Sequence, residues 1–342
     1  MRLGQRSGVA QALVVVILLW LSACLVGADP SDAENLTPGD YDFSLAHAGR
    51  VRTYLLHVPP QAADKKPLAV VLNFHGGGGT AKGQKEWSGL DAVADREGFL
   101  VVYPDGTGRF GRRLLTWNAG TCCGYASTNA VDDVGFVLTL LADLAARTPV
   151  DHTRIYATGM SNGAMMSYRL AVEASEWIAA IAPVAGGMVV ETFTPRRAMP
   201  VMHFHSVDDP RALYRGGLGP RLPFLRRVLH PPVEETVGHW VQYDECPPQP
   251  EVGPTRHGTA GEEDATHTAT KIVYSPCRQG TEIVLWKLTG AGHVWPGPGP
   301  KFPEWLLGAP TSVVNASEKM WQFFRRFSRP DAPLLVKENN PP

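Results

Sequence analysis

Hydrophobic residues along this chain fall into short runs that alternate with amphipathic stretches. Residues 68–74 (LAVVLNF) form a continuous apolar run, which is typical of a strand buried on both faces, and residues 99–103 (FLVVY) repeat the pattern. Residues 132–147 instead space their apolar side chains as an amphipathic helix does, with acidic residues in the first turn, where the helix dipole favours them. Strands that alternate with helices in this way predict an α/β fold, a mostly parallel sheet covered on both faces.

The same alternation continues to the end of the chain. Residues 51–58 alternate as an early antiparallel strand does, and residues 163–172 and 316–327 are expected to be helices, the second after a capping box. Further strands are expected at residues 154–158, 178–184, 201–204 and 282–288. Because no repeat or linker interrupts this pattern, we predict one domain over residues 41–328. A linker at residues 29–40 precedes it, and a Pro-rich tail at residues 329–342, expected to be loose, follows it.

The amino terminus has the composition of an export signal. Arg2 and Arg6 precede an apolar stretch at residues 11–23, which is shorter than the about 20 apolar residues that a membrane-spanning helix requires. Two cleavage patterns remain open, because the segment ending at Cys24 (LSAC) resembles a bacterial lipobox and residues 26–28 (VGA) fit plain secretion. We therefore predict a signal peptide at residues 1–28 and an extracytoplasmic protein, secreted or lipid-anchored.

The net charge and the composition limit the classes of binding partner that the protein is expected to have. The 32 basic and 33 acidic residues leave a net charge of -1, so there is no basic excess of the kind that nucleic-acid binding requires. We expect no nucleic-acid partner, and membrane attachment only through a lipidated Cys24. The 35 glycines and 29 prolines favour a loop-rich enzyme over a helical bundle.

Four cysteines follow the signal region, in a compartment where disulfides persist. Cys246 and Cys277 flank a polar insert and are expected to pair. The adjacent Cys122 and Cys123 could form a vicinal disulfide, remain thiols or bond elsewhere. Their spacing does not suggest a zinc site, because no second close pair of ligands accompanies them.

A serine lies between two glycines in the stretch YATGMSNGAM. In the motif G-x-S-x-G the nucleophilic serine occupies a sharp turn between a strand and a helix, and small neighbours let the two elements approach. Gly159, Ser161 and Gly163 fit this motif, with an apolar run before it and a helical run after it. The alternative, a purely structural turn, is disfavoured by that context. Ser161 is therefore the candidate nucleophile.

A serine nucleophile needs a histidine base and a carboxylate that orients the base. When they follow a nucleophile elbow, these partners occur in the order serine, acid, histidine, each in a loop after a strand. Asp208 and Asp209 follow the strand expected at residues 201–204, and the residue types alone do not choose between them. His293 lies in a Gly-rich loop after the last strand and is the candidate base.

The oxyanion of such a reaction needs two backbone donors. One is the amide of Asn162, after the nucleophile, and the other is expected at Gly76 or Gly77, in the HGGGG segment that follows residues 68–74. A phosphate-binding loop is a weaker interpretation of these glycines, because no Lys-Ser/Thr pair follows them. Trp117 and Trp295 are candidates for a flat apolar slot that would hold an aromatic acyl group.

The motifs NFHGGGG, WNAGTCCG, VDDVGF, TGMSNGAMMSYRLA, PVAGG, HSVDDP and GAGHVWPG occur in this order. Over about residues 45–327 the chain resembles the polyhydroxybutyrate depolymerase-like, or feruloyl esterase-like, family of secreted α/β-hydrolase serine esterases. The resemblance implies that Ser161, Asp209 and His293 form the triad, that Asp209 is preferred over Asp208, and that Cys246 is linked to Cys277. Ser206 and Arg211 depart from the family pattern near the acid.

The sequence therefore predicts a serine carboxylic-ester hydrolase that acts through an acyl-enzyme and requires no metal or organic cofactor. The resemblance implies either hydroxyalkanoate esters or feruloyl and related plant-wall esters as substrates, and the sequence does not choose between them. A peptidase on the same fold is disfavoured, because the chain has no room for the additional domain that such enzymes usually carry. A non-catalytic binding lipoprotein is disfavoured because all triad positions and both oxyanion segments are present.

Overall fold

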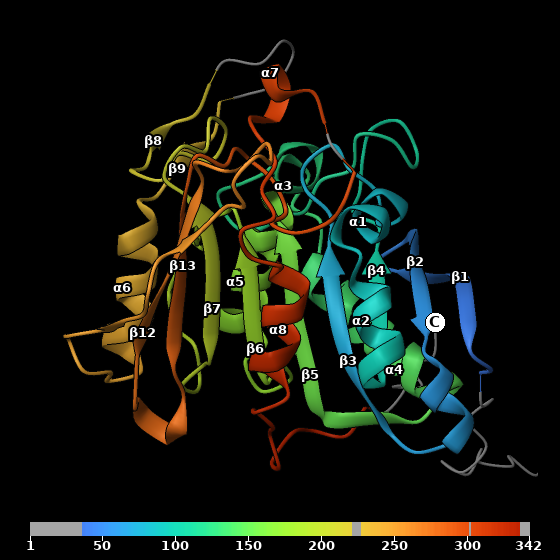
Figure 1. Ribbon diagram of the computed structural model, residues 1–342. Coiled ribbons are helices and arrows are strands. Elements are labelled where there is room, and N and C mark those ends of the chain that lie inside the picture. Colours follow the sequence, from blue (N-terminus) through green and yellow to red (C-terminus); the bar gives the residue numbers. More distant parts are fainter. Residues whose placement is uncertain (1–35, 221–226, 301, 336–342) are drawn as a thin grey trace, which may run out of the picture. The chain divides into compact units, whose positions relative to one another are not determined.

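A mixed sheet of eleven strands forms the centre of the computed structural model, which describes residues 36–220, 227–300 and 302–335 (Figure 1). The expected signal peptide and Cys24 lie outside the described residues. The parallel part of the sheet has the spatial order β4-β3-β5-β6-β7-β13. These strands are β3 (Leu68–Phe74), β4 (Phe99–Pro104), β5 (Val150–Met160), β6 (Ala180–Val184), β7 (Val201–Ser206) and β13 (Ile283–Thr289).

Antiparallel strands extend both sides of this parallel region. On one side, β2 (Arg50–Val58) pairs with β4, and β1 (Gly39–His47) pairs with β2 at the edge. On the other side, β12 (Thr268–Tyr274) pairs with β13 and carries two short strands, β10 (Glu251–Val252) and β11 (Arg256–His257). Burial follows this arrangement, because β4 is buried throughout whereas β1 alternates between half-buried and exposed residues.

Helices cover both faces of the sheet. One face is covered by α4 (Asp133–Arg147), α5 (Asn162–Glu173) and α6 (Val233–Tyr243), and the other by α1 (Ala81–Ser88), α2 (Leu90–Glu97) and α8 (Ala316–Phe324) (Figure 1). Each set of helices packs its apolar stripe into a separate core, one on each face. The prediction of a mostly parallel sheet covered on both faces is therefore confirmed.

Shorter elements connect these layers. They are the helices α3 (Gly124–Thr128) and α7 (Glu304–Leu307), the 3₁₀ turns at Pro60–Asp64 and Arg278–Gly280, and the ribbon of β8 (Gly217–Leu218) and β9 (Leu229–His230). Within the described residues no helix has the length and apolar composition needed to cross a membrane. Figure 1 shows α7, β8 and β9 beyond the carboxyl ends of the parallel strands.

Three parts of the fold differ from the sequence expectations. The sequence patterns predict neither the helices α1, α2 and α6 nor the strands β1 and β12, and α1 shows why, because it buries only an alanine, a glutamine and a serine. The start of the Pro-rich tail is docked and not loose. The Arg329 amide donates to the Thr153 carbonyl at 2.7 Å and its buried guanidinium donates to the Ser175 carbonyl at 2.9 Å.

The polar insert beyond α6 is closed by a disulfide. Cys246 lies just after α6, Cys277 lies between β12 and β13, and the two are linked with their Cα atoms 4.2 Å apart. The 30 residues between them contain β10, β11 and β12, so the insert extends the sheet instead of forming an unstructured loop.

Candidate active site

The three residues of the expected triad follow three strands of the parallel region. Ser161 directly follows β5, Asp209 lies in the loop after β7, and His293 lies in the loop after β13. Since neighbouring parallel strands all end at the same edge, the sheet brings residues far apart in sequence to one edge (Figure 1).

Ser161 occupies a strained turn between β5 and α5. Its φ of 57° and ψ of -115° lie in a region that side chains with a Cβ rarely adopt. A Cβ on Gly159 would lie 2.6 Å from the Phe74 carbonyl oxygen, and a Cβ on Gly163 would overlap the same carbonyl group. Both glycines are thus required for β5 and α5 to approach β3. Ser161 itself is half-buried, while its neighbours on both sides are buried.

The loops after β7 and β13 bring a carboxylate and an imidazole together. His293 Nδ1 donates to Asp209 Oδ2 at 2.7 Å, and both side chains are buried. Asp208 is exposed and its Oδ2 instead accepts from the Gly290 amide at 2.7 Å. The structure therefore places Asp209, and not Asp208, against the candidate base.

The Asp209 carboxylate is surrounded by donors. Its Oδ1 accepts from the amides of Arg211 at 2.7 Å and Ala212 at 2.8 Å, while His205 Nε2 lies 3.5 Å from Oδ2. Burial alone would raise the pKa of Asp209, but the charge of His293 and the hydrogen bonds from His205 and His293 bring it well below its ordinary value. This carboxylate is held ionised at neutral pH.

The glycine segment after β3 lies directly against the candidate nucleophile. A Cβ on Gly76 would be 3.5 Å from the Ser161 Cβ, and a Cβ on Gly77 would be 3.7 Å from the Asn162 Cβ. The amide of Gly78 is committed to the Leu115 carbonyl and that of Gly79 to the Gly76 carbonyl. Gly76 and Gly77 are thus the members of this segment whose amides remain candidates for an oxyanion.

Trp117 does not have the exposed face that a substrate-binding residue would need. It is fully buried, and its Nε1 donates to the His75 carbonyl at 3.0 Å. Its backbone N–H and carbonyl group bind the side chain of Asn162. The expected substrate-binding role is corrected to a structural one, since Trp117 connects the glycine segment to the residue that follows the candidate nucleophile.

Trp295 is also part of the interior. Only 4% of it is exposed, its Nε1 donates to Ser317 Oγ at 3.0 Å, and it packs in the core beneath α8. The structure does not support the expected substrate-binding role here either. The family-like sequence around it, which follows His293 directly, gave no indication of which way the indole points.

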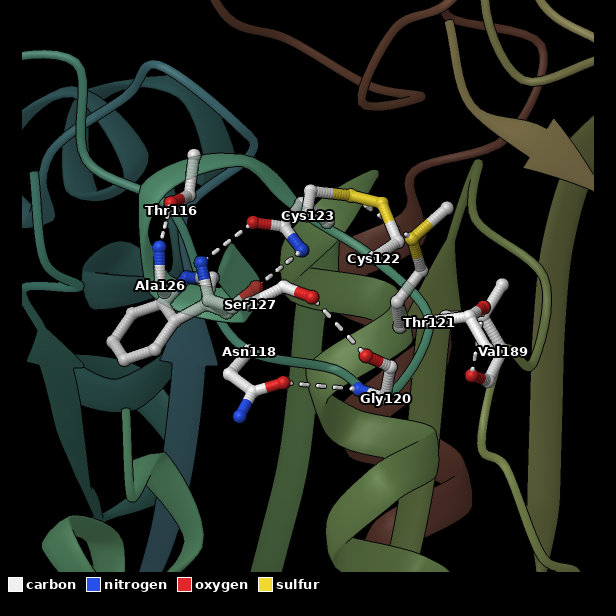
Figure 2. Close-up of a disulfide and its surroundings, with 12 residues drawn as sticks. Thr116, Asn118, Gly120, Thr121, Cys122, Cys123, Ala126, Ser127 and Val189 are labelled. Atoms are coloured by element: carbon white, nitrogen blue, oxygen red, sulfur yellow. Dashed lines mark hydrogen bonds between the residues drawn. A yellow bond between two sulfur atoms is a disulfide. The ribbon is translucent and has the colours of Figure 1, made fainter. Parts of the chain in front are cut away.

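Cys122 and Cys123 form a vicinal disulfide beside the first turn of α5 (Figure 2). Cys123 Sγ lies 3.8 Å from Met165 Sδ, and a small apolar cluster joins Ala119, Cys122, Met165 and Val189. The surrounding loop is tied to its neighbours, for example by the Ser127 hydroxyl, which donates to the Gly120 carbonyl at 3.2 Å. Of the states left open by the sequence, the structure shows the vicinal pair.

One group of side chains among the described residues has the spacing of metal ligands, namely Asp40, His57 and Asp91. The Lys85 ammonium group donates to both carboxylates of this group, at 2.8 Å to Asp40. Burial lowers the pKa of His57, but the hydrogen bond with Asp40 and the charge of Asp91 together outweigh burial, so the pKa lies above its ordinary value. The group is therefore a network of ion pairs, remote from the candidate triad in the sequence.

A strained serine elbow, a buried acid and base pair, and a glycine segment at one edge of a mostly parallel sheet define an α/β-hydrolase. The chain superposes on the solved "Acetyl xylan esterase from Aspergillus awamori" with a TM-score of 0.53, covering 83% of this chain and 99% of that chain at 15% identity. The chain belongs to the esterase PHB depolymerase family, whose model matches residues 52–222, half of the chain. It is a carboxylic ester hydrolase.

The relatives include bacterial and fungal esterases. "Putative esterase NocK" of Nocardia uniformis subsp. tsuyamanensis is 29% identical over 81% of this chain and 80% of that protein. "Feruloyl esterase B" of Piromyces equi is 26% identical over 71% of this chain. "Bifunctional acetylxylan esterase/xylanase XynS20E" of Neocallimastix patriciarum is 26% identical over 72% of this chain. The match spans 42% and 31% of these last two proteins.

Proposed function

We propose that this esterase is an extracytoplasmic serine hydrolase whose triad is Ser161, Asp209 and His293. The observation that carries the proposal is the buried 2.7 Å hydrogen bond between His293 and Asp209, at the sheet edge where Ser161 occupies its strained turn. A nucleophile elbow and an oriented histidine base are the parts that acyl transfer requires. The order of the three residues along the chain agrees with this assignment.

In the proposed reaction, Ser161 Oγ attacks the ester carbonyl carbon while His293 Nε2 takes the hydroxyl proton. The resulting oxyanion accepts hydrogen bonds from the amide of Asn162 and from that of Gly76 or Gly77. The imidazolium then gives its proton to the leaving alcohol, which departs as the acyl-enzyme forms. Water, deprotonated by His293, attacks the acyl-enzyme, and the acid is released as Ser161 recovers its proton. Asp209 stays ionised and orients His293 throughout.

Two substrate classes remain in the proposal. The family is named for PHB depolymerase, which fits short hydroxyalkanoate esters, whereas two relatives are named for feruloyl and acetylxylan esters. Trp117 and Trp295 were the residues expected to form a flat apolar slot for a feruloyl group. Because both are buried, neither supports feruloyl esters over hydroxyalkanoate esters. We therefore keep hydroxyalkanoate esters and plant-wall esters as the two alternatives.

The proposed location outside the cytoplasm depends on two observations. The sequence of residues 1–28 has the composition of an export signal, and the two disulfides suit an oxidising compartment. Mass spectrometry of the mature protein after expression with its native leader tests this. A mature chain beginning at Asp29 supports plain secretion, a diacylglyceryl group on Cys24 supports lipid anchoring, and an intact leader on cytoplasmic protein contradicts the proposal.

The experiment that tests the function measures hydrolysis of p-nitrophenyl acetate, methyl ferulate, a 3-hydroxybutyrate oligomer and a peptide anilide by the wild type and by Ser161→Ala. We expect ester hydrolysis that falls by roughly 10³-fold or more in the variant, and no peptide cleavage. The preferred ester then selects the substrate class. Equal rates in the two proteins would refute the serine mechanism, and an inert wild type would favour a binding role on the hydrolase fold.

A further inference from the structure

A buried chain of hydrogen bonds connects the helix of the candidate nucleophile to the loop of the candidate acid. The Tyr168 hydroxyl is 2.8 Å from His203 Nδ1, His203 Nε2 is 3.0 Å from His205 Nδ1, and His205 Nε2 is 2.7 Å from the Ala212 carbonyl oxygen. Tyr168 and His203 are fully buried and His205 is 2% exposed. None of these three side chains takes part in the reaction described above.

The last acceptor fixes the proton of His205, and a neutral His205 then determines the protons of His203 and Tyr168. A carbonyl oxygen can only accept, so His205 Nε2 carries a proton. A neutral His205 then has a bare Nδ1, which accepts from His203 Nε2–H, and His203 in turn has a bare Nδ1, which accepts from the Tyr168 hydroxyl. Burial holds the pKa of His203 well below its ordinary value, which agrees with a neutral ring.

The fixed proton of His205 faces the candidate acid. His205 Nε2 is 3.5 Å from Asp209 Oδ2, the same oxygen that accepts from His293. The Ala212 carbonyl that accepts from His205 belongs to the residue whose amide donates to Asp209 Oδ1 at 2.8 Å. His205 therefore acts on Asp209 both directly, with its N–H dipole, and through the turn that holds the carboxylate.

The other end of the chain begins in α5. This helix starts directly after Ser161, and Tyr168 lies about two turns further along it. Tyr168, His203 and His205 thus form a direct polar connection between the element that places the nucleophile and the loop that places the acid. Both imidazoles are in the interior strand β7, whose last residue precedes the acid by three positions.

We propose that His205 is a positioning residue for Asp209, and that the Ala212 carbonyl, together with His203 and Tyr168, keeps its Nε2 protonated and beside the acid. This inference rests on the proposed triad, because positioning Asp209 affects turnover only if Asp209 orients the base. An Nε2 that lost its proton would face the carboxylate and the Ala212 carbonyl with a lone pair. Asp209 would then lose a donor, and the turn around it would lose a bond.

Two substitutions at His205 separate its contacts. In His205→Gln the side-chain amide reaches the position of Nε2 and can still donate toward Asp209 and Ala212. In His205→Asn the shorter amide reaches the position of Nδ1 and keeps only the contact with His203. We expect His205→Asn to lower kcat roughly 10- to 100-fold with KM changed less than about 2-fold, and His205→Gln to recover most of kcat.

A spectroscopic measurement tests the proton positions independently of activity. Correlation spectra of ¹⁵N-labelled histidine at pH 7.5 should show His205 as the Nε2–H tautomer in the wild type. Tyr168→Phe removes the hydroxyl that donates to His203 Nδ1, so a second tautomer should become populated for His203, while His205 keeps its Nε2–H because the Ala212 carbonyl can only accept. An Nδ1–H tautomer of His205 in the wild type would overturn the inference.

The outcomes distinguish this inference from the proposed function. If Ser161→Ala abolishes ester hydrolysis while a folded His205→Asn retains the wild-type kcat, the triad stands and the positioning role is refuted. If Ser161→Ala hydrolyses esters as the wild type does, the proposed function itself fails. Equal losses in His205→Gln and His205→Asn, with unfolding midpoints lowered together, would reduce His205 to a packing residue and also overturn the positioning role.

Discussion

The backbone of Trp117 holds the side chain of Asn162 at both ends. Asn162 Oδ1 accepts from the Trp117 amide at 2.7 Å, and Nδ2 donates to the Trp117 carbonyl oxygen at 3.1 Å. The Trp117 indole also binds the carbonyl oxygen of His75, which begins the glycine segment. Both amide groups proposed for the oxyanion therefore depend on the placement of one buried tryptophan.

Trp117→Phe should lower both stability and turnover, because the phenyl ring keeps most of the packing but cannot donate to the His75 carbonyl. We expect a loss of about 1–2 kcal/mol in the free energy of unfolding and a roughly 10-fold lower kcat. Trp295→Phe is the matched control, since it loses an equivalent bond to Ser317. It should lose similar stability with kcat unchanged. Equal kcat in the two variants would show that Trp117 is a packing residue alone.

The adjacent aspartates offer a second matched pair. Asp209→Asn keeps the shape of the side chain but cannot hold His293 in the required tautomer, and kcat should fall on the order of 10³- to 10⁴-fold. Asp208→Asn should change kcat by less than about 3-fold, because its side-chain oxygen can still accept from the Gly290 amide. Initial rates on p-nitrophenyl acetate measure both. The reverse ranking would transfer the acid role to Asp208.

The close approach at the nucleophile turn makes Gly163 sensitive to a single added methyl group. Gly163→Ala would place a Cβ against the Phe74 carbonyl, and we expect a loss of about 1–3 kcal/mol together with most of the activity. Gly238 lies in α6 with no atom within 4 Å of an added Cβ. Gly238→Ala should therefore gain up to about 1 kcal/mol. Urea unfolding of both variants checks the opposite signs.

His75 should make the fold less stable in acid. Burial lowers its pKa to about 4, whereas an unfolded chain has its ordinary value near 6.5. As the pH falls from 6.5 toward 4, the His75 imidazole binds a proton in the unfolded chain but not in the folded chain. The free energy of unfolding therefore decreases by up to about 3 kcal/mol. The buried His203 acts in the same direction. Urea unfolding at pH 7.5, 6.0 and 5.0 measures the slope.

The variant His75→Gln isolates this contribution. A glutamine oxygen can still accept from the Gly106 amide, as His75 Nε2 does at 3.0 Å, but does not titrate. Its stability should therefore decline less than that of the wild type between pH 7.5 and 5.0. A slope for His75→Gln as steep as that of the wild type would contradict the assignment.

The elements that could be predicted from sequence are those in which almost every side chain is apolar and buried. The strands β3 and β4 are buried on both faces, so their continuous apolar runs identified them. Ser161 was recognisable because its turn imposes glycine at two fixed positions. By contrast α1 buries polar and small residues beside few apolar ones, so no hydrophobic stripe indicates it.

The site was less predictable where several side chains of the same kind compete. Asp208 and Asp209 are adjacent and identical in type, so apart from the family resemblance, which prefers Asp209, only the direction in which each side chain leaves the loop separates them. Trp117 and Trp295 occur in motifs next to site residues, which suggested ligand contact, but their indole groups point into the interior. His203 and His205 resembled ordinary strand residues, because a chain of hydrogen bonds has no sequence signature.

The disulfide between Cys246 and Cys277 closes an insert in which one segment could be replaced by another. It holds the two ends of the insert 4.2 Å apart between Cα atoms, at the side of the sheet where β12 extends it. Because the closure is covalent, these ends stay joined in the unfolded chain as well, and the entropy of closing the loop grows only slowly with the number of residues between them. The turn between β10 and β11 could therefore be exchanged for a foreign segment, such as a binding module that delivers the esterase to a chosen polymer.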